Sequence, residues 1–448
     1  MCTNFSSSNK MGSNNFVQVK EAIVITPSEP TPNCILSLST LDSQLFLRFT
    51  IEYLLVYNPC NGLDRRQFCS RIKFALGRAL VQYYPLAGRV QERKDGPLQV
   101  VCRAQGAVFV EAVSGYKRVD FERAPRHVEE WRQLLWLNVD DVLKGAPPLV
   151  VQLTWLADGA VAIGFGFNHC LCDGVGSAEF MNLFAELTRG VSGRGPRPVW
   201  DRHLLGPFTT TKECVRFNSV SHHPEFNRVQ DCCGFMDRFS TEKLVPTSSV
   251  FVKFHINQLK RQANLLNDSP NYTSFEVVSA HIWRCWAKSL NMPSTQVLRL
   301  VFSVNFRNRL KPGLPVGFYG NGFALACAQT TVKDLTEKGL GYATDLIKRA
   351  KERVDGTYVR EVIELVSGNR TSPDSVGVLI LSQWSRLGLE KVDFGLGKPA
   401  HVGPICSDKY CLLLPVHNQR EAVRVMVAVP TSAVDMYQHL LTKPFSSN

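Results

Sequence analysis

One stretch in the first half of the chain limits the possible folds most, because two strand patterns and a helix pattern follow one another directly. Apolar residues alternate over 149–155 and again over 161–168, and Asp158-Gly159 between them is typical of a tight turn. Over 174–189 the apolar residues recur at helical spacing. The pattern predicts an antiparallel hairpin that leads through a short loop into an amphipathic helix.

The second predicted strand has one face of small residues, Ala162, Gly164 and Gly166. Small side chains leave room for another backbone or a ligand to approach the strand closely. If the alternation continues, His169 lies on the opposite, apolar face at the end of the strand. The pattern therefore places a histidine at the junction of a strand and a loop, where functional sites are often built.

His169 and Asp173 form a His-x-x-x-Asp pair in this loop. An imidazole with a pKa near neutrality can take a proton from an alcohol, an amine or a thiol. Asp173 could orient the imidazole, anchor the loop through an arginine, or cap the helix that follows. The residues alone leave these alternatives open, together with a purely structural role for both side chains.

The rest of the chain shows the same mixture of patterns. Strands are predicted at the start of 17–32, over 298–305, and over 408–416 and 422–429 as a hairpin; helices are predicted over 65–83, 274–289, 345–366 and 432–441; a strand passing into a helix is predicted over 251–265. Helices and antiparallel hairpins in both halves indicate an α/β or α+β protein of two domains.

The segment 190–235 is rich in Pro, Gly, Arg and His and has little periodicity. It is predicted to be a long connection between the two halves. We therefore expect a disordered lead-in over 1–15, an N-terminal domain over 16–189, a crossover loop over 190–235 and a C-terminal domain over 236–448.

Composition limits the classes of partner and the location. The 448 residues are 44% hydrophobic and 20% charged, as in ordinary globular proteins. No stretch approaches the roughly 20 apolar residues of a membrane-spanning helix. The N-terminus lacks the apolar run of a signal peptide, and the 14 cysteines are expected to be reduced thiols, which predicts a cytoplasmic protein.

The formal charge of +12 comes from scattered basic residues, without the signature of a nucleic-acid-binding module. A solvated basic surface is the favoured interpretation, and attraction of a phosphorylated cofactor is the alternative. No nucleic-acid partner is expected.

Other reactive arrangements fit the sequence less well. No Gly-x-Ser-x-Gly motif is present, and Cys170 and Cys172 are expected to be buried structural thiols. The adjacent pairs His222-His223 and Cys232-Cys233 do not match the spacing of zinc ligands, so no metal is expected. In the loop 393–399, Asp393 can accept hydrogen bonds from the amides of its own turn, and Gly395 and Gly397 permit positive φ.

Five motifs, taken together, are far more specific than the His-x-x-x-Asp pair alone. They are His169 to Gly174 (HxxxDG), Asp393 to Gly397 (DFGLG), Tyr84 to Arg89 (YPLAGR), Phe275 to Trp286 with His281 and Trp283, and Asn305 to Arg309 with Gly320-Asn321. In this order and spacing, over nearly the whole chain, they resemble the motifs of the plant BAHD acyltransferases, which use acyl-CoA donors.

The resemblance implies two similar mixed-sheet domains of the chloramphenicol-acetyltransferase type, joined by a long crossover loop. It implies an active site in a channel between the domains, which acyl-CoA and the acceptor enter from opposite faces. The expected reaction moves a hydroxycinnamoyl, benzoyl or acetyl group to the hydroxyl or amine of a small plant metabolite. Acyl-CoA is then a co-substrate, no cofactor is bound permanently, and a monomer is expected.

The resemblance also assigns roles to residues. His169 is the expected general base, while Asp173 points away from it and pairs with an arginine, for which Arg307 is the candidate. In the hydroxycinnamoyl transferases a Thr and a Trp lie near the thioester carbonyl, and Ser382 and Trp384 occupy similar places here. These two are the candidate donors to the oxyanion of the tetrahedral intermediate.

Lys260 resembles a lysine that meets a phosphate of CoA, and Asp393, Gly395 and Gly397 are expected to be structural. The sequence departs from the family at Leu396, where the family has Trp. We expect altered packing there rather than lost activity. The alternative function is a catalytically dispensable member of the same fold that acts as a partner or scaffold in acyl-lipid metabolism.

Overall fold

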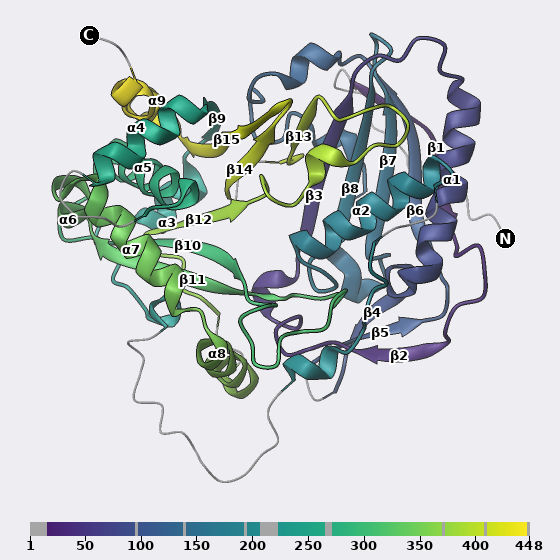
Figure 1. Cartoon of the computed structure of the whole chain (residues 1–448), viewed down its shortest axis with the longest axis horizontal. Helices are drawn as coiled ribbons and strands as arrows, with labels where there is room; N and C mark the ends of the chain where they lie inside the picture. The colour runs from purple at the N-terminus through teal and green to yellow at the C-terminus, as the bar shows by residue number, and fades with distance from the viewer. Residues whose placement is uncertain are drawn as a thin grey trace.

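The computed structural model describes residues 16–445, except for 95–96, 138–139, 192–194, 207–222, 265–270, 370–371 and 407–409. The predicted lead-in over 1–15 and the part of the crossover loop over 207–222 lie outside the described residues. The chain forms two sheet-and-helix domains side by side, as the sequence predicted (Figure 1). The boundaries at 189/190 and 235/236 stay predictions.

The first domain is built on a six-stranded mixed sheet of order β1-β6-β7-β8-β3-β13. Its strands are β1 (Val17–Ile25), β3 (Thr50–Tyr57), β6 (Ala107–Ser114), β7 (Leu149–Trp155), β8 (Val161–Asn168) and β13 (His401–Gly403). Helices α1 (Arg65–Gln82) and α2 (Gly174–Thr188) pack against each other and lie on one face of this sheet (Figure 1). A small sheet of β2 (Cys34–Ser37), β5 (Leu98–Cys102) and β4 (Arg89–Glu92) adjoins it.

The second domain repeats this plan with the order β11-β10-β12-β14-β15-β9. Its strands are β9 (Leu244–Phe251), β10 (Val297–Asn305), β11 (Phe323–Thr331), β12 (Val378–Gln383), β14 (Cys411–Val416) and β15 (Gln419–Pro430). Its helices are α3 (Phe235–Thr241), α4 (Lys253–Asn264), α5 (Ser274–Ser289), α6 (Val332–Glu337), α7 (Gly339–Arg353), α8 (Gly356–Asn369) and α9 (Val434–Thr442). The central helix α5 contacts α4, α7 and α9 and is buried along most of its length.

One strand connects the two domains. β13 comes from the second half of the sequence, but His401 to Gly403 pair antiparallel with Leu54 to Val56 of β3 in the first sheet. The chain therefore returns from the second domain to extend the first sheet before it enters β14 (Figure 1). This exchange fixes the two sheets relative to each other near the junction between the domains.

The predicted hairpin and helix are present, as β7, β8 and α2. All residues of β7 and β8 are buried. The rings of Phe68 on α1 and of Phe180 and Phe184 on α2 pack on aromatic side chains of these two strands. A Cβ at Gly164 would lie 2.3 Å from the carbonyl oxygen of Leu134. The face of β8 that carries small residues therefore lets another backbone approach closely. The sequence had left open whether a backbone or a ligand does so.

The prediction of one long helix over 345–366 is wrong, since α7 ends at Arg353 and α8 begins at Gly356. The Asp355 carboxylate accepts hydrogen bonds of 2.9 Å from the amides of Thr357 and Tyr358, as a residue that starts a helix does. The last hairpin is also tighter than predicted, because β15 begins at Gln419 and Asn418 adopts a positive φ of 57°. Within the described parts of the chain, no helix has the length and apolar character needed to cross a bilayer.

Candidate active site

His169 follows the last residue of β8 and is held by its backbone. Its amide donates to the carbonyl oxygen of Phe49 at 2.9 Å, and its carbonyl oxygen accepts from Nδ2 of Asn321 at 2.8 Å. The imidazole lies between the rings of Phe49 and Phe323, with centroid distances of 5.1 and 5.7 Å. Because Phe49 belongs to the first domain and Phe323 to β11 of the second, His169 is located at their junction.

A cavity of about 600 Å³ opens beside His169. The first domain contributes one wall and strands β10, β11 and β12 contribute much of the other. Its apolar lining residues are Phe46, Leu47, Phe49, Ile51, Val175, Val301, Phe323, Leu325, Pro373, Val378, Ile380, Leu381, Leu387 and Leu412. This size is in the range of about 300–1,000 Å³ that is usual for small-molecule sites. We name it the central cavity.

Burial of His169 sets its protonation state. Removal from solvent lowers the pKa of the imidazole below its ordinary value of 6.5, although nearby hydrogen bonds and the charge of Asp173 act in the opposite direction. The side chain is therefore neutral at pH 7. A neutral imidazole in a cavity wall can accept a proton, which is what general base catalysis requires.

Asp173 does not hold the imidazole. Its carboxylate accepts from the amides of Val175 and Gly176, both at 3.1 Å, so it caps α2. It also accepts from Nη1 and Nη2 of Arg307, at 2.8 and 3.1 Å, and from the amide of Gly322 at 3.0 Å. The capping role and the arginine anchor, two of the alternatives that the sequence left open, therefore occur together.

The charge of Asp173 is strongly stabilised by these partners. Burial alone acts to raise the pKa of the carboxyl, but Arg307 and the amides of Gly176 and Gly322 bring it below its ordinary value of 3.8. Since Arg307 follows β10 and Asp173 precedes α2, the pair is an ion pair between the domains at the edge of the central cavity.

Asp42 is a residue of the site that the sequence did not reveal. It is fully buried, and its carboxylate accepts from Nη1 of Arg202 at 2.6 Å and from the backbone and side-chain nitrogens of Asn321 at 2.9 and 2.8 Å. Arg202 also donates to the carbonyl oxygen of Leu171 at 2.8 Å. Asp42 thus supports the loop of His169 from behind, through Arg202 and Asn321. Only the Gly320-Asn321 motif gave a signal for this network.

Ser382 and Trp384 both line the central cavity, at the end of β12 and directly after it. The Trp384 ring is 7% exposed and packs on the ring of Tyr53 with a centroid distance of 4.6 Å. The two candidate oxyanion donors therefore lie in the same cavity as His169. Tyr53 and Phe49, which the sequence did not single out, complete this part of the wall.

The loop that follows has structural contacts and does not line the central cavity. The Asp393 carboxylate accepts from the amides of Gly395 and Gly397 at 2.7 and 2.9 Å, and both glycines have positive φ values, of 92° and 78°. Phe394 is fully buried against aromatic residues of the first domain. Leu396 packs on the same core.

Lys260 lies on α4 and not in the central cavity. It lines a separate cavity of about 250 Å³ together with Lys253, Arg386 and Arg420. Arg386 also lines the central cavity, so the two spaces adjoin at this side chain. We name the smaller space the basic cavity.

Comparison with known proteins identifies the family. The sequence model of the Transferase family matches residues 16–442. The chain belongs to this family, the BAHD acyltransferases. This BAHD protein is similar to the omega-hydroxypalmitate O-feruloyl transferase of Arabidopsis thaliana, with 32% identity over 96% of the chain and 94% of the relative. It is also similar to the fatty alcohol:caffeoyl-CoA acyltransferase of Arabidopsis thaliana, with 30% identity over 94% of the chain and 97% of the relative.

Solved structures support the fold. Vinorine synthase superimposes with a TM-score of 0.73 and 23% identity, and covers 96% of this chain and 99% of its own. TRI101 of F. sporotrichioides, complexed with coenzyme A and T-2, gives a TM-score of 0.70 and 15% identity over 90% of this chain and 97% of its own. The BAHD protein therefore has the two-domain fold that its motifs implied. Its family and its relatives show that it is an acyl-CoA-dependent acyltransferase.

Proposed function

We propose that His169 is the general base that activates an acceptor hydroxyl for direct attack on the thioester of an acyl-CoA. One observation carries the proposal: a neutral imidazole lies in the wall of a large cavity between the domains. The attack forms a tetrahedral oxyanion, which then expels CoA as the thiol and leaves the acyl group on the acceptor. Ser382 and Trp384 are the proposed donors to the oxyanion.

The charges in the central cavity favour a neutral alcohol over an amine. Both carboxylates that line its described wall are already paired, Asp173 with Arg307 and Asp374 with Nη2 of Arg299 at 2.9 Å. Neither is free to bind an ammonium group. An uncharged hydroxyl needs no carboxylate to bind it, so we propose O-acylation.

The apolar wall favours an acceptor with a large hydrocarbon surface. Side chains of Phe, Leu, Ile and Val make up about half of the described lining residues, and burial of hydrocarbon there is favourable by roughly 25 cal/mol per Å². Two similar relatives are named for a fatty alcohol and for omega-hydroxypalmitate as acceptors. We therefore propose a long-chain aliphatic alcohol as the acceptor and a feruloyl- or caffeoyl-type group as the acyl donor, with the benzoyl and acetyl classes as alternatives.

The basic cavity is the proposed site for the phosphates of CoA. Lys253, Lys260, Arg386 and Arg420 line it, and the single acidic residue among its described lining, Glu421, is paired with Lys253 at 2.8 Å. Because Arg386 lines both cavities, a CoA held there by its phosphates can extend its thioester past this residue toward His169. No permanently bound cofactor is needed for this chemistry.

We also propose a cytoplasmic monomer. Both walls of the central cavity come from one chain, so a single copy forms the site. The cysteines of the described residues are free thiols, as is usual in the cytosol.

Release of free CoA tests the proposal. The purified protein and its His169→Ala variant receive feruloyl-, caffeoyl-, benzoyl- and acetyl-CoA, each with hexadecanol, a short alcohol or a long-chain amine. We expect release by the parent protein only, and fastest with the long-chain alcohol. If CoA binds but neither protein releases it with any acceptor, the scaffold function in acyl-lipid metabolism replaces the proposed one.

A further inference from the structure

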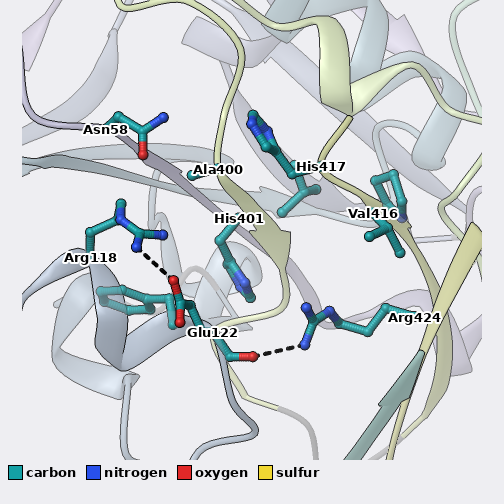
Figure 2. A pocket seen from close by; sticks show the side chains of 11 residues that line it. Asn58, Arg118, Glu122, Ala400, His401, Val416, His417 and Arg424 are labelled. Atoms are coloured by element: carbon teal, nitrogen blue, oxygen red, sulfur yellow. Dashed lines mark hydrogen bonds and ion pairs between the residues drawn. The ribbon is translucent and has the colours of Figure 1, made fainter. Parts of the chain in front are cut away.

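A second pocket lies at the junction of the domains and shares no lining residue with the described wall of the central cavity (Figure 2). It encloses about 230 Å³. The first domain contributes Arg118 and Glu122, and the second half of the chain contributes His401 of β13, His417 and Arg424 of β15. Four of these five side chains carry nitrogen donors or acceptors, so the pocket is polar and rich in basic groups.

His401 contributes its ring to the wall of this pocket, and its Nε2 is buried beside it. The residue is 8% exposed, and its Nε2 has no hydrogen-bond partner among the described residues. Phe121 and Trp131 pack on the ring, with centroid distances of 6.0 and 5.5 Å. Figure 2 shows the ring directed toward the space between Glu122 and Arg424. The Nε2 atom is itself fully buried, so a ligand in the pocket contacts the ring of His401 and not this nitrogen.

Arg424 makes no ion pair with a described residue. Its Nη1 donates to the carbonyl oxygen of Glu122 at 3.0 Å and to the hydroxyl of Ser248 at 3.2 Å, both of which are neutral groups. No carboxylate of the described chain lies within ion-pair distance of the guanidinium. Burial lowers the pKa of Arg424, although the more distant charge of Glu122 acts in the opposite direction. A partly buried cation without an ion-pair partner favours an anion nearby.

The other charges in the pocket cancel. Nη2 of Arg118 pairs with the Glu122 carboxylate at 2.6 Å, and Glu122 is the single acidic residue in the described lining. Burial and the charge of Arg424 lower the pKa of His401 to about 3, so its ring is neutral at pH 7. His417 is engaged by the carbonyl oxygen of Pro399 and by Asn418. Among Arg118, Glu122, His401 and Arg424, the net charge is therefore one positive unit.

We propose that this pocket binds a small oxyanion, a carboxylate or phosphate group. Arg424 supplies the charge, Arg118 adds donors at the opposite side, and the neutral ring of His401 forms the wall between them. Phosphate and a dicarboxylate such as malate both carry anionic oxygens that two guanidinium groups can bind. The pocket volume suits a group of this size rather than a whole coenzyme.

Binding would link the two domains. Arg118 precedes Glu122 in the first domain and Arg424 lies on β15 in the second sheet, so an anion held by both exists only in the folded, assembled protein. A ligand that binds only the folded state raises the melting temperature, and above its dissociation constant the rise grows with the logarithm of the ligand concentration. Thermal stability therefore reports on the pocket without any need for acyltransferase activity.

The test is a melting-temperature titration of the full-length protein with sodium phosphate and with malate, against sodium chloride at equal ionic strength. We expect a rise of several degrees with phosphate or malate that grows with the logarithm of concentration, and none with chloride. The oxyanion with the larger rise identifies the group. The variant Arg424→Gln should abolish the rise. Arg118→Gln should reduce the rise, and this variant tests the proposal if Arg424→Gln fails to fold.

Two matched variants separate this pocket from other basic sites. Arg126→Gln removes the same charge from an arginine whose side chain is 91% exposed and pairs with Glu130 outside the pocket, so the rise should persist. Lys260→Gln weakens the basic cavity and should also leave the rise intact. The proposal is overturned if the rise is lost in Lys260→Gln, if chloride matches phosphate and malate, or if the rise survives in both Arg424→Gln and Arg118→Gln.

Discussion

The carboxylate of Asp173 binds the guanidinium of Arg307 through both oxygens, at 2.8 and 3.1 Å, and makes no hydrogen bond with the imidazole of His169 in the described structure. The aspartate of the His-x-x-x-Asp motif is therefore a structural link between the domains rather than a partner of the base. This geometry separates two effects that a mutation series can measure independently: loss of the base should reduce catalysis, while loss of the aspartate should reduce stability.

Substitution of Asp173 by Asn should destabilise the protein by about 3–5 kcal/mol, because it leaves a buried arginine without its partner. Asn is a good helix N-cap, so the cap of α2 should survive this change. Asp173→Ala should cost roughly 1 kcal/mol more, because it removes the cap as well. Denaturant unfolding of the three proteins measures both steps. Equal stability of Asp173→Asn and the parent protein would contradict the assigned ion pair.

The same ion pair predicts a loss of stability in acid. The pKa of Asp173 in the folded state is lowered, so its contribution is fully present above the ordinary value of 3.8 and is lost as pH falls through the folded value. The difference in the free energy of unfolding between the parent protein and Asp173→Asn should therefore be constant above pH 5 and shrink below pH 4. A difference that is unchanged down to the lowest pH at which the protein folds would argue against the lowered pKa.

Removal of the base should affect catalysis far more than folding. His169→Ala should reduce kcat/KM about 10²–10⁴-fold, the usual contribution of a general base. His203→Ala, at an exposed histidine outside the central cavity, is the matched control and should retain full activity. Steady-state assays of CoA release measure both, with melting temperature as the check on folding. Retention of activity in His169→Ala would remove the histidine from the mechanism.

The pH dependence of kcat/KM should show an acid limb below pH 6.5. Burial lowers the pKa of His169 from 6.5, and only the neutral imidazole can accept the acceptor proton. Activity should therefore rise through the lowered pKa and be level between pH 7 and 8. A midpoint above pH 6.5 would show that another group controls the acid limb, or that bound substrate stabilises the imidazolium.

The sequence predicted the features that depend on neighbours along the chain. The hairpin, the helix after it and the position of His169 at the strand end all follow from local periodicity and turn residues. The pairing of Asp42 with Asn321 spans 279 residues, and no local pattern carries such a contact. β13 was missed for a related reason, since its three residues are too few to show an alternation. At 354–355 the helical spacing continues across the break, and Asp355 became recognisable as a cap only in the structure.

A buried cluster behind the central cavity gives the last prediction. The His223 ring bonds to the carboxylates of Glu225 and Glu361, at 3.2 and 2.9 Å, and the Tyr358 ring packs on it with a centroid distance of 4.2 Å. Burial acts to lower the pKa of His223, but the two carboxylates outweigh it and the pKa is raised above 6.5. The cluster also reaches the cavity wall, because the Tyr358 hydroxyl donates to the carbonyl oxygen of Leu325 at 2.8 Å.

His223→Phe should retain the packing on Tyr358 and remove the charge. A raised pKa in the folded state gives a stability contribution that is fully present below pH 6.5 and is lost as pH rises through the folded value. The variant should therefore be less stable than the parent protein by on the order of 1–3 kcal/mol at pH 6, with a smaller difference at higher pH. Urea unfolding across this range measures the difference. If the difference in the free energy of unfolding grows with pH, His223 is neutral in the folded protein. The two carboxylates then form hydrogen bonds with its ring but no ion pair.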